Sequence, residues 1–192
     1  MIRLFDLFKR LPHLRFPCVQ TLLEKAKKDF KIDHTPCPHC GSVGDLILHG
    51  TYRRYLIFCE DKEVYESLVD IERVFCLSCK RSHALLPDLL IPYISYSLSF
   101  ILCVLRKYFF KKMTVAKICK TYGIAVSTLY AWKARFSEHK GLDLGVLEKY
   151  LPSTDPYLLF PRDNHSQNLC SFFSRFGFSF LQHKGTTRSQ GP

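Results

Sequence analysis

Apolar residues recur at helical spacing between residues 113 and 136, and this pattern predicts two short helices joined by a tight turn. The first helix is expected to begin after Thr114, a good N-cap residue, and to end at Gly123, which accepts a left-handed backbone conformation. The second opens near Ala125 and buries one residue in each turn: Leu129, Trp132 and Phe136. The pattern predicts a helix-turn-helix, and an ordinary helical hairpin in a small core is the competing interpretation.

Two other kinds of pattern lie upstream of this stretch. Short runs with strand character cover residues 46–49, 52–58 and 64–75, with a polar turn at 60–63. A broad apolar stripe then predicts a helix that ends near Lys111 and is capped by Ser95 or Ser97. This helix would support the other two, since two short helices bury little surface alone. A further amphipathic helix is expected near residues 19–30, and one short helix within residues 141–152.

The clearest chemical motif is a pair of C-x-x-C sequences, formed by Cys37 with Cys40 and by Cys76 with Cys79. This spacing lets two thiolates of each pair bind one ion, so the four cysteines predict a structural zinc site with one ion per chain. A redox-active pair is the alternative, although such a pair usually opens a helix. Three histidines are near enough in sequence to substitute as ligands, and we expect them at the surface or behind the ligands: His34, His39 and His83.

Charge is distributed unevenly along the chain, whose net charge is +11. Residues 101–140 contain nine Lys and Arg and the single acid Glu138, whereas residues 37–83 contain six basic and seven acidic residues. The predicted helices are therefore expected to bind a polyanion, with double-stranded DNA the first candidate and a membrane surface the weaker one. The predicted DNA contacts are Lys111, Lys112, Lys117, Lys120, Val126, Ser127, Tyr130, Lys133 and Arg135.

Other features bear on the location of the protein. No apolar run approaches the length of a transmembrane helix, and charged residues interrupt the N-terminal stretch, so neither a membrane span nor a signal peptide is predicted. Five of the nine cysteines occur singly in core-like segments, which favours reduced thiols. We expect a cytoplasmic protein associated with the nucleoid.

The motifs together resemble a family of bacterial proteins from mobile elements. The resemblance is carried by CPHCGS at 37–42, HGTYRR at 49–54 and VFCLSCKRSHALLPDLLIPY at 74–93, followed by the predicted helix-turn-helix. In outline the chain is similar to the small zinc-ribbon, helix-turn-helix proteins of insertion sequences and to N-terminal regions of transposases. The resemblance implies DNA binding, with the four cysteines as zinc ligands. Ala125 departs from it, because many such motifs have a capping Ser or Thr at that position.

The sequence thus predicts an α+β protein in which a small zinc-ribbon β domain with four cysteine ligands precedes a three-helix DNA-binding domain. The expected segments are an N-terminal helical segment (1–36), the zinc ribbon (37–83), a connector (84–96), the helix-turn-helix domain (97–140) and a C-terminal extension (141–192) with a disordered end. Five phenylalanines in the extension are expected to dock on the body or on a partner: Phe172, Phe173, Phe176, Phe178 and Phe180.

The predicted function is sequence-specific DNA binding, in a transposon-associated protein or a transcriptional regulator. No enzymatic activity is expected, because the four cysteines would fill the zinc coordination sphere and residues 141–192 are too few for a carboxylate nuclease domain. Two alternatives stay open: the chain is the DNA-recognition part of a transposase, or an adaptor for a separate recombinase. Self-association is a further possible partnership.

Overall fold

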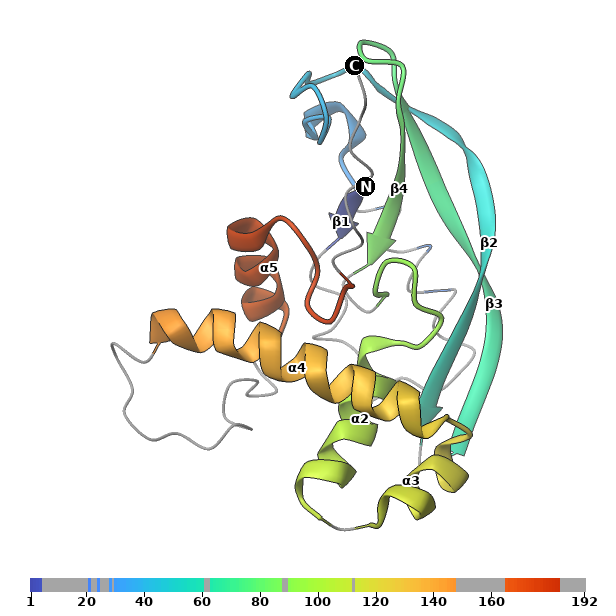
Figure 1. The fold of residues 1–192 in the computed structure, drawn as a ribbon. Coiled ribbons are helices and arrows are strands. Elements are labelled where there is room, and N and C mark those ends of the chain that lie inside the picture. The colour runs from blue at the N-terminus through green and yellow to red at the C-terminus, as the bar shows by residue number, and fades with distance from the viewer. Residues whose placement is uncertain are drawn as a thin grey trace, which may run out of the picture.

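A computed structural model describes residues 1–4, 21, 24, 28, 30–60, 63–87, 90–111, 113–147 and 165–183. The fold is mixed α and β, with the strands of the sheet before residue 88 and the helices α2–α5 from residue 98 onward (Figure 1). The elements in chain order are β1 (Ile2–Leu4), η2 (Ile32–His34), β2 (Leu46–Glu60), β3 (Glu63–Cys76), β4 (Ser82–Pro87), α2 (Leu98–Phe109), α3 (Val115–Tyr122), α4 (Val126–Leu147) and α5 (His165–Phe176).

One four-stranded sheet, in the order β1-β4-β3-β2, is built around a long antiparallel pair. Strands β2 and β3 pair from Leu46 opposite Cys76 to Glu60 opposite Glu63. The register shifts once, between Leu48 and Thr51, where Gly50 has a φ of 89°. The two strands predicted at 46–49 and 52–58 are therefore one strand interrupted by a bulge, a distortion that glycine favours.

The sheet includes residues beyond the predicted zinc ribbon. Strand β4 extends to Pro87 and pairs antiparallel with β3, so the first part of the predicted connector belongs to the sheet. Strand β1 pairs parallel with β4, although residues 1–36 were predicted to be helical. Thr21, Glu24 and Lys28 are helical, and most of the helix predicted at 19–30 lies outside the described residues.

The helices α2, α3 and α4 pack around a shared apolar core. Helix α2 begins at Ser97, whose hydroxyl accepts a hydrogen bond from the Phe100 backbone N–H at 3.1 Å. Thr114 caps α3 in the same way, and Gly123 ends that helix in the predicted left-handed conformation, with a φ of 61°. The three residues predicted to be buried on α4 are buried, and Phe100 and Val104 of α2 join them. The predicted pattern of caps and burial is confirmed here.

Helix α4 is longer than predicted, because it continues through Gly141 to Leu147 instead of giving way to a separate short helix. The segment 165–183 folds back onto it (Figure 1). The His139 ring is buried and its Nδ1 accepts a hydrogen bond from the Leu181 backbone N–H at 2.8 Å. Rings of Phe172, Phe178 and Phe180 surround His139 at centroid distances of 5.2–5.6 Å. The phenylalanine cluster thus docks on the body of the protein.

The sheet and the helices are joined through the segment before α2. The Ile57 backbone N–H donates to the Ser95 carbonyl, and the Ser97 N–H donates to the Ile57 carbonyl, each at 2.8 Å. Arg54, on the same strand β2, donates hydrogen bonds to the carbonyls of Ile91 and Ile94. Residues 90–97 are therefore an ordered junction, and the two halves of the chain pack together as predicted.

Candidate functional site

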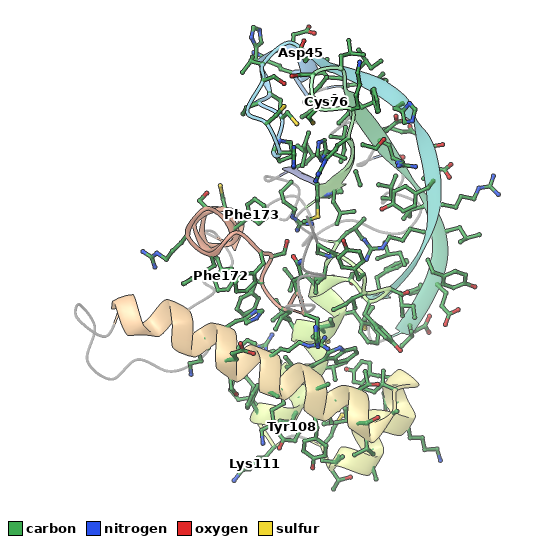
Figure 2. The ribbon with its side chains drawn as sticks, turned by 45° about the horizontal axis from the view of Figure 1, so that its top comes forward. Asp45, Cys76, Tyr108, Lys111, Phe172 and Phe173 are labelled. Atoms are coloured by element: carbon green, nitrogen blue, oxygen red, sulfur yellow. The ribbon has the colours of Figure 1, made fainter. Side chains whose placement is uncertain are left out.

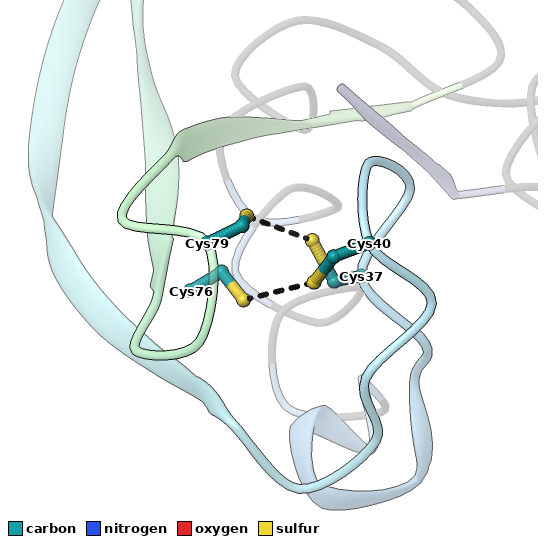
Figure 3. A group of neighbouring side chains, drawn as sticks. All are labelled: Cys37, Cys40, Cys76 and Cys79. Atoms are coloured by element: carbon teal, nitrogen blue, oxygen red, sulfur yellow. Dashed lines mark hydrogen bonds between the residues drawn. The ribbon is translucent and has the colours of Figure 1, made fainter.

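Four cysteine side chains converge at one end of the sheet (Figure 3). Cys37 and Cys40 precede β2, while Cys76 ends β3 and Cys79 lies in the turn before β4. The sulfurs lie within 4.8 Å of one another, and the Cys37–Cys79 and Cys40–Cys76 pairs are each 3.7 Å apart. A tetrahedral ion with metal–sulfur bonds of about 2.3 Å separates its sulfurs by about 3.8 Å. The geometry therefore fits one metal ion with four thiolate ligands.

The two C-x-x-C turns have the same backbone structure. In the first, the Cys37 carbonyl accepts from the Gly41 N–H at 2.9 Å, and the Cys37 N–H donates to the Ser42 carbonyl at 2.8 Å. In the second, Cys76 makes the equivalent bonds to residues four and five positions later, Lys80 and Arg81, each at 2.9 Å. Gly41 and Lys80 both have positive φ angles, 76° and 57°. These turns aim both thiols of each pair at the same point.

Neighbouring groups affect how easily the thiols ionise. The Ser42 hydroxyl lies 3.1 Å from the Cys40 sulfur and 3.4 Å from the Cys76 sulfur. Hydrogen bonding from Ser42 lowers the pKa of Cys40 to about 6. Burial has the opposite effect on Cys79 and raises its pKa to about 12. Hydrogen bonding from Ser42 therefore favours the thiolate form of Cys40 that a metal binds, whereas burial opposes the deprotonation of Cys79.

His83 is the one candidate substitute ligand that contacts the cluster. Its ring is buried and its Nε2 lies 3.3 Å from the Cys37 sulfur, which matches the prediction of a residue behind the ligands. Burial lowers the pKa of His83. His34 and His39 are exposed, and among the described residues the group with metal-binding geometry consists of the four cysteines. Neither C-x-x-C pair opens a helix, so the turns lack the feature typical of redox-active pairs.

The predicted DNA contacts lie on the helices α2–α4 and at their junctions. Lys111, Lys117 and Lys120 are exposed, and Lys111 extends away from the helices in Figure 2. On α4, Val126, Ser127 and Tyr130 are exposed and Lys133 and Arg135 are half-buried. Lys112 lies outside the described residues. The structure thus exposes Val126, Ser127 and Tyr130 at the start of α4, and it exposes lysines on α3 and directly after α2.

Tyr108, a half-buried residue of α2, lies beside two of these α4 residues. Its ring packs edge-on against Tyr130, with the centroids 6.2 Å apart. The Lys133 ammonium lies 5.4 Å from the centroid of Tyr108 and 5.8 Å from that of Tyr130. The sequence alone could not reveal these contacts, because Tyr108 is 22 or more residues away from Tyr130 and Lys133 and meets them only through the packing of α2 against α4.

The described part of the chain has no helix that is both long enough and apolar enough to cross a membrane. The chain matches no curated protein and no solved structure. A family model described as a domain of unknown function (DUF6431) matches residues 37–132, from the first cysteine of the cluster to Trp132 of α4. Because this match covers half of the chain, including the cysteine cluster, α2, α3 and the start of α4, the protein belongs to the DUF6431 family.

Proposed function

We propose that this protein binds double-stranded DNA sequence-specifically through a helix-turn-helix formed by α3 and α4. The observation that carries the proposal is the start of α4, where Val126, Ser127 and Tyr130 are exposed directly after the left-handed turn at Gly123. Residues 101–140, which include most of α2, all of α3 and the first part of α4, contain nine Lys and Arg and a single acid. A helix held by a tight turn after a shorter supporting helix is the arrangement that places side chains in a major groove.

The cysteine cluster supports a structural role for zinc in this protein. Four thiolates at tetrahedral spacing suit zinc better than a hard cation such as Mg²⁺, which prefers oxygen ligands. A filled set of four ligands leaves no open position for a reactive water molecule, so we infer a binding protein and not an enzyme. The metal would fix the end of the sheet, while the other end of β2 holds the junction to α2.

The contacts with DNA would divide between bases and phosphates. Val126, Ser127 and Tyr130 lie in the first two turns of α4, the part of a recognition helix that reaches base edges. The lysines Lys111, Lys112, Lys117 and Lys120, with Arg135, would flank that helix and contact phosphates. The outer face of the β2–β3 pair is a poorer DNA surface, because Arg53 there is paired with Asp70 at 3.5 Å.

Selection of bound DNA from a random pool, followed by titrations at several salt concentrations, tests this function. Tyr130→Ala and Ser127→Ala are each expected to cost roughly 1–3 kcal/mol at the selected site and little on other DNA. Lys117→Gln should weaken binding to all sequences and reduce the salt slope by about one. Tyr55→Ala is the matched control, because Tyr55 and Tyr130 are similarly exposed, at 50% and 44%, and Tyr55 lies on β2, opposite Leu68 of β3. No selected sequence, or no effect of both α4 variants, would refute the proposal.

An adaptor role for a separate recombinase is the second candidate, and one observation favours it. The metal end of the sheet exposes large apolar side chains, each at least 43% accessible: Val43, Ile47, Leu48 and Leu77. Large apolar side chains that are left in water at one end of a molecule favour a protein partner there. Capture of the purified recombinase by the parent, and its loss in Leu48→Asp with DNA binding intact, would support this role. The role as the DNA-recognition part of a transposase, in the cytoplasm and at the nucleoid, is compatible with both candidates.

A further inference from the structure

A small cluster of aromatic and basic side chains lies where the end of α2 meets the outward surface of α4. Tyr130 and Lys133 are three residues apart on α4, so they share one side of that helix. Tyr108 approaches from α2 and packs against Tyr130. The Lys133 ammonium lies within 5.8 Å of both ring centroids. One cation is therefore held by two rings that belong to two different helices.

This arrangement orients the ammonium before any ligand arrives. A free lysine side chain samples many rotamers and loses that freedom on binding, which weakens the interaction. Cation–π contacts with Tyr108 and Tyr130 restrict Lys133 in advance. Within the part of the chain that the structure describes, Lys133 forms no ion pair with a carboxylate. Its charge and its N–H donors are therefore available to acceptors on a ligand.

We propose that Lys133, positioned by Tyr108 and Tyr130, selects a guanine by donating hydrogen bonds to O6 and N7 in the major groove. The assignment rests on the proposed DNA-binding function of α4. Guanine is the base with two adjacent acceptors on its major-groove edge, and Lys and Arg are the side chains that read them most often. A phosphate is the competing acceptor. A base is favoured because the cation–π contact with Tyr130 keeps Lys133 on the same side of α4 as the predicted base-reading residues.

The position of Lys133 along α4 also predicts where the guanine lies in the binding site. Lys133 follows Val126, the first residue of α4, by seven positions. At about 1.5 Å per residue this spans about 10 Å of helix axis. Successive bases are about 3.4 Å apart, so the guanine should lie about three base pairs from the position contacted by the start of α4.

Selection from a random DNA pool by matched variants tests this assignment. The parent should enrich guanine at one position, and Lys133→Met should lose that preference by roughly 5- to 150-fold while the other positions stay selected. Lys133→Arg should keep the preference, because arginine reads the same pair of acceptors. Tyr108→Leu should weaken it and Tyr108→Phe should keep it, since phenylalanine retains the ring. Thermal unfolding of each variant, compared with that of the parent, checks that the helices remain folded.

Other outcomes separate this assignment from the proposed function. If Lys133→Met weakens all sequences equally and lowers the salt slope by about one, the ammonium contacts a phosphate and the assignment is wrong. A selected site that is unchanged in Lys133→Met would also overturn the assignment, while DNA binding itself would stand. Failure of the parent to select any sequence would overturn both the assignment and the proposed function.

Discussion

Removal of the proposed zinc ion should unfold the metal end of the sheet and leave the helices intact. The apolar core at that end is small. Apart from its cysteines, its buried side chains are Ile2, Leu46, Val74 and Leu85. At roughly 1.5–3 kcal/mol for each buried side chain, their burial contributes about 6–12 kcal/mol. Ordering each residue of the two cysteine turns, 37–42 and 76–81, costs about 1–2 kcal/mol, and over both turns this cost is at least as large as that gain. A four-thiolate zinc site contributes about 10–16 kcal/mol, so the metal decides whether this end folds.

The helices have a separate core, and this permits a two-signal assay. Trp132, the single tryptophan of the chain, is 3% exposed and belongs to the helical core, which contains none of the four clustered cysteines. A chelator titration should release one zinc per chain and reduce the far-UV circular dichroism of the sheet. The fluorescence maximum of Trp132 should stay where it is. Cys79→Ser should reproduce the effect without chelator, whereas Cys119→Ser, a change to a half-buried cysteine of α3, should bind zinc normally.

Two results would refute this reasoning. Protein purified without any zinc, or a Cys79→Ser variant as stable as the parent, would show that the four sulfurs do not hold a structural ion. A red shift of Trp132 fluorescence in step with zinc release would show that the two cores unfold as one cooperative unit.

Three further substitutions test the helices and the junction. Gly123→Ala should destabilise the protein by about 1–2 kcal/mol in chemical denaturation, because alanine is strained at the φ of 61° found there. The added methyl group meets no atom within 4 Å, so backbone strain is the expected cause. An unchanged denaturation midpoint would contradict this. His139→Leu should lower the free energy of unfolding by about 1–3 kcal/mol, because it leaves the buried Leu181 N–H without its acceptor. His139→Asn should cost less, since the amide oxygen of asparagine can accept that hydrogen bond. Equal losses in the two variants would argue against a role for the hydrogen bond. Arg54→Lys should loosen the junction between sheet and helices.

Local signals in the sequence predicted much of this structure. The C-x-x-C pairs, the Thr114 cap and the turn at Gly123 each depend on a few neighbouring residues, and all three are found where the sequence places them. The α+β class followed from the same signals, since alternating runs precede helical periodicity. Whether the helices bind DNA stays a prediction, because it depends on a partner.

Features that depend on distant contacts were not predictable. Strand β1 is three residues long and pairs with residues more than 80 positions away, so no periodicity could reveal it. A separate short helix was predicted within residues 141–152, yet α4 continues through Gly141 to Leu147, although glycine usually weakens a helix by about 1 kcal/mol. Docking of the segment 165–183 beside His139 supplies tertiary contacts just before that glycine, and such contacts commonly outweigh propensity.

Arg54 of β2 links the sheet to the segment before α2, and its replacement tests how strongly this contact stabilises the junction. One guanidinium nitrogen of Arg54 donates to the carbonyls of both Ile91 and Ile94, and burial lowers the pKa of this arginine. A lysine ammonium keeps the charge but is a compact, strongly hydrated group on a different stem. Hydrogen bonds to charged groups contribute about 1.5–3 kcal/mol each, so loss of both bonds in Arg54→Lys should lower the free energy of unfolding by about 3–6 kcal/mol.

Arg53→Lys is the matched control, because the Arg53 side chain is 77% exposed and pairs with the surface carboxylate of Asp70. Exposed ion pairs contribute at most about 1 kcal/mol, so this variant should unfold close to the parent. Hydrogen exchange then locates the effect: in Arg54→Lys the Ser97 N–H, which donates to the Ile57 carbonyl, should exchange faster. Equal stability of the two variants, or unchanged exchange at Ser97, would mean that the backbone bonds of Ile57 hold the junction without Arg54.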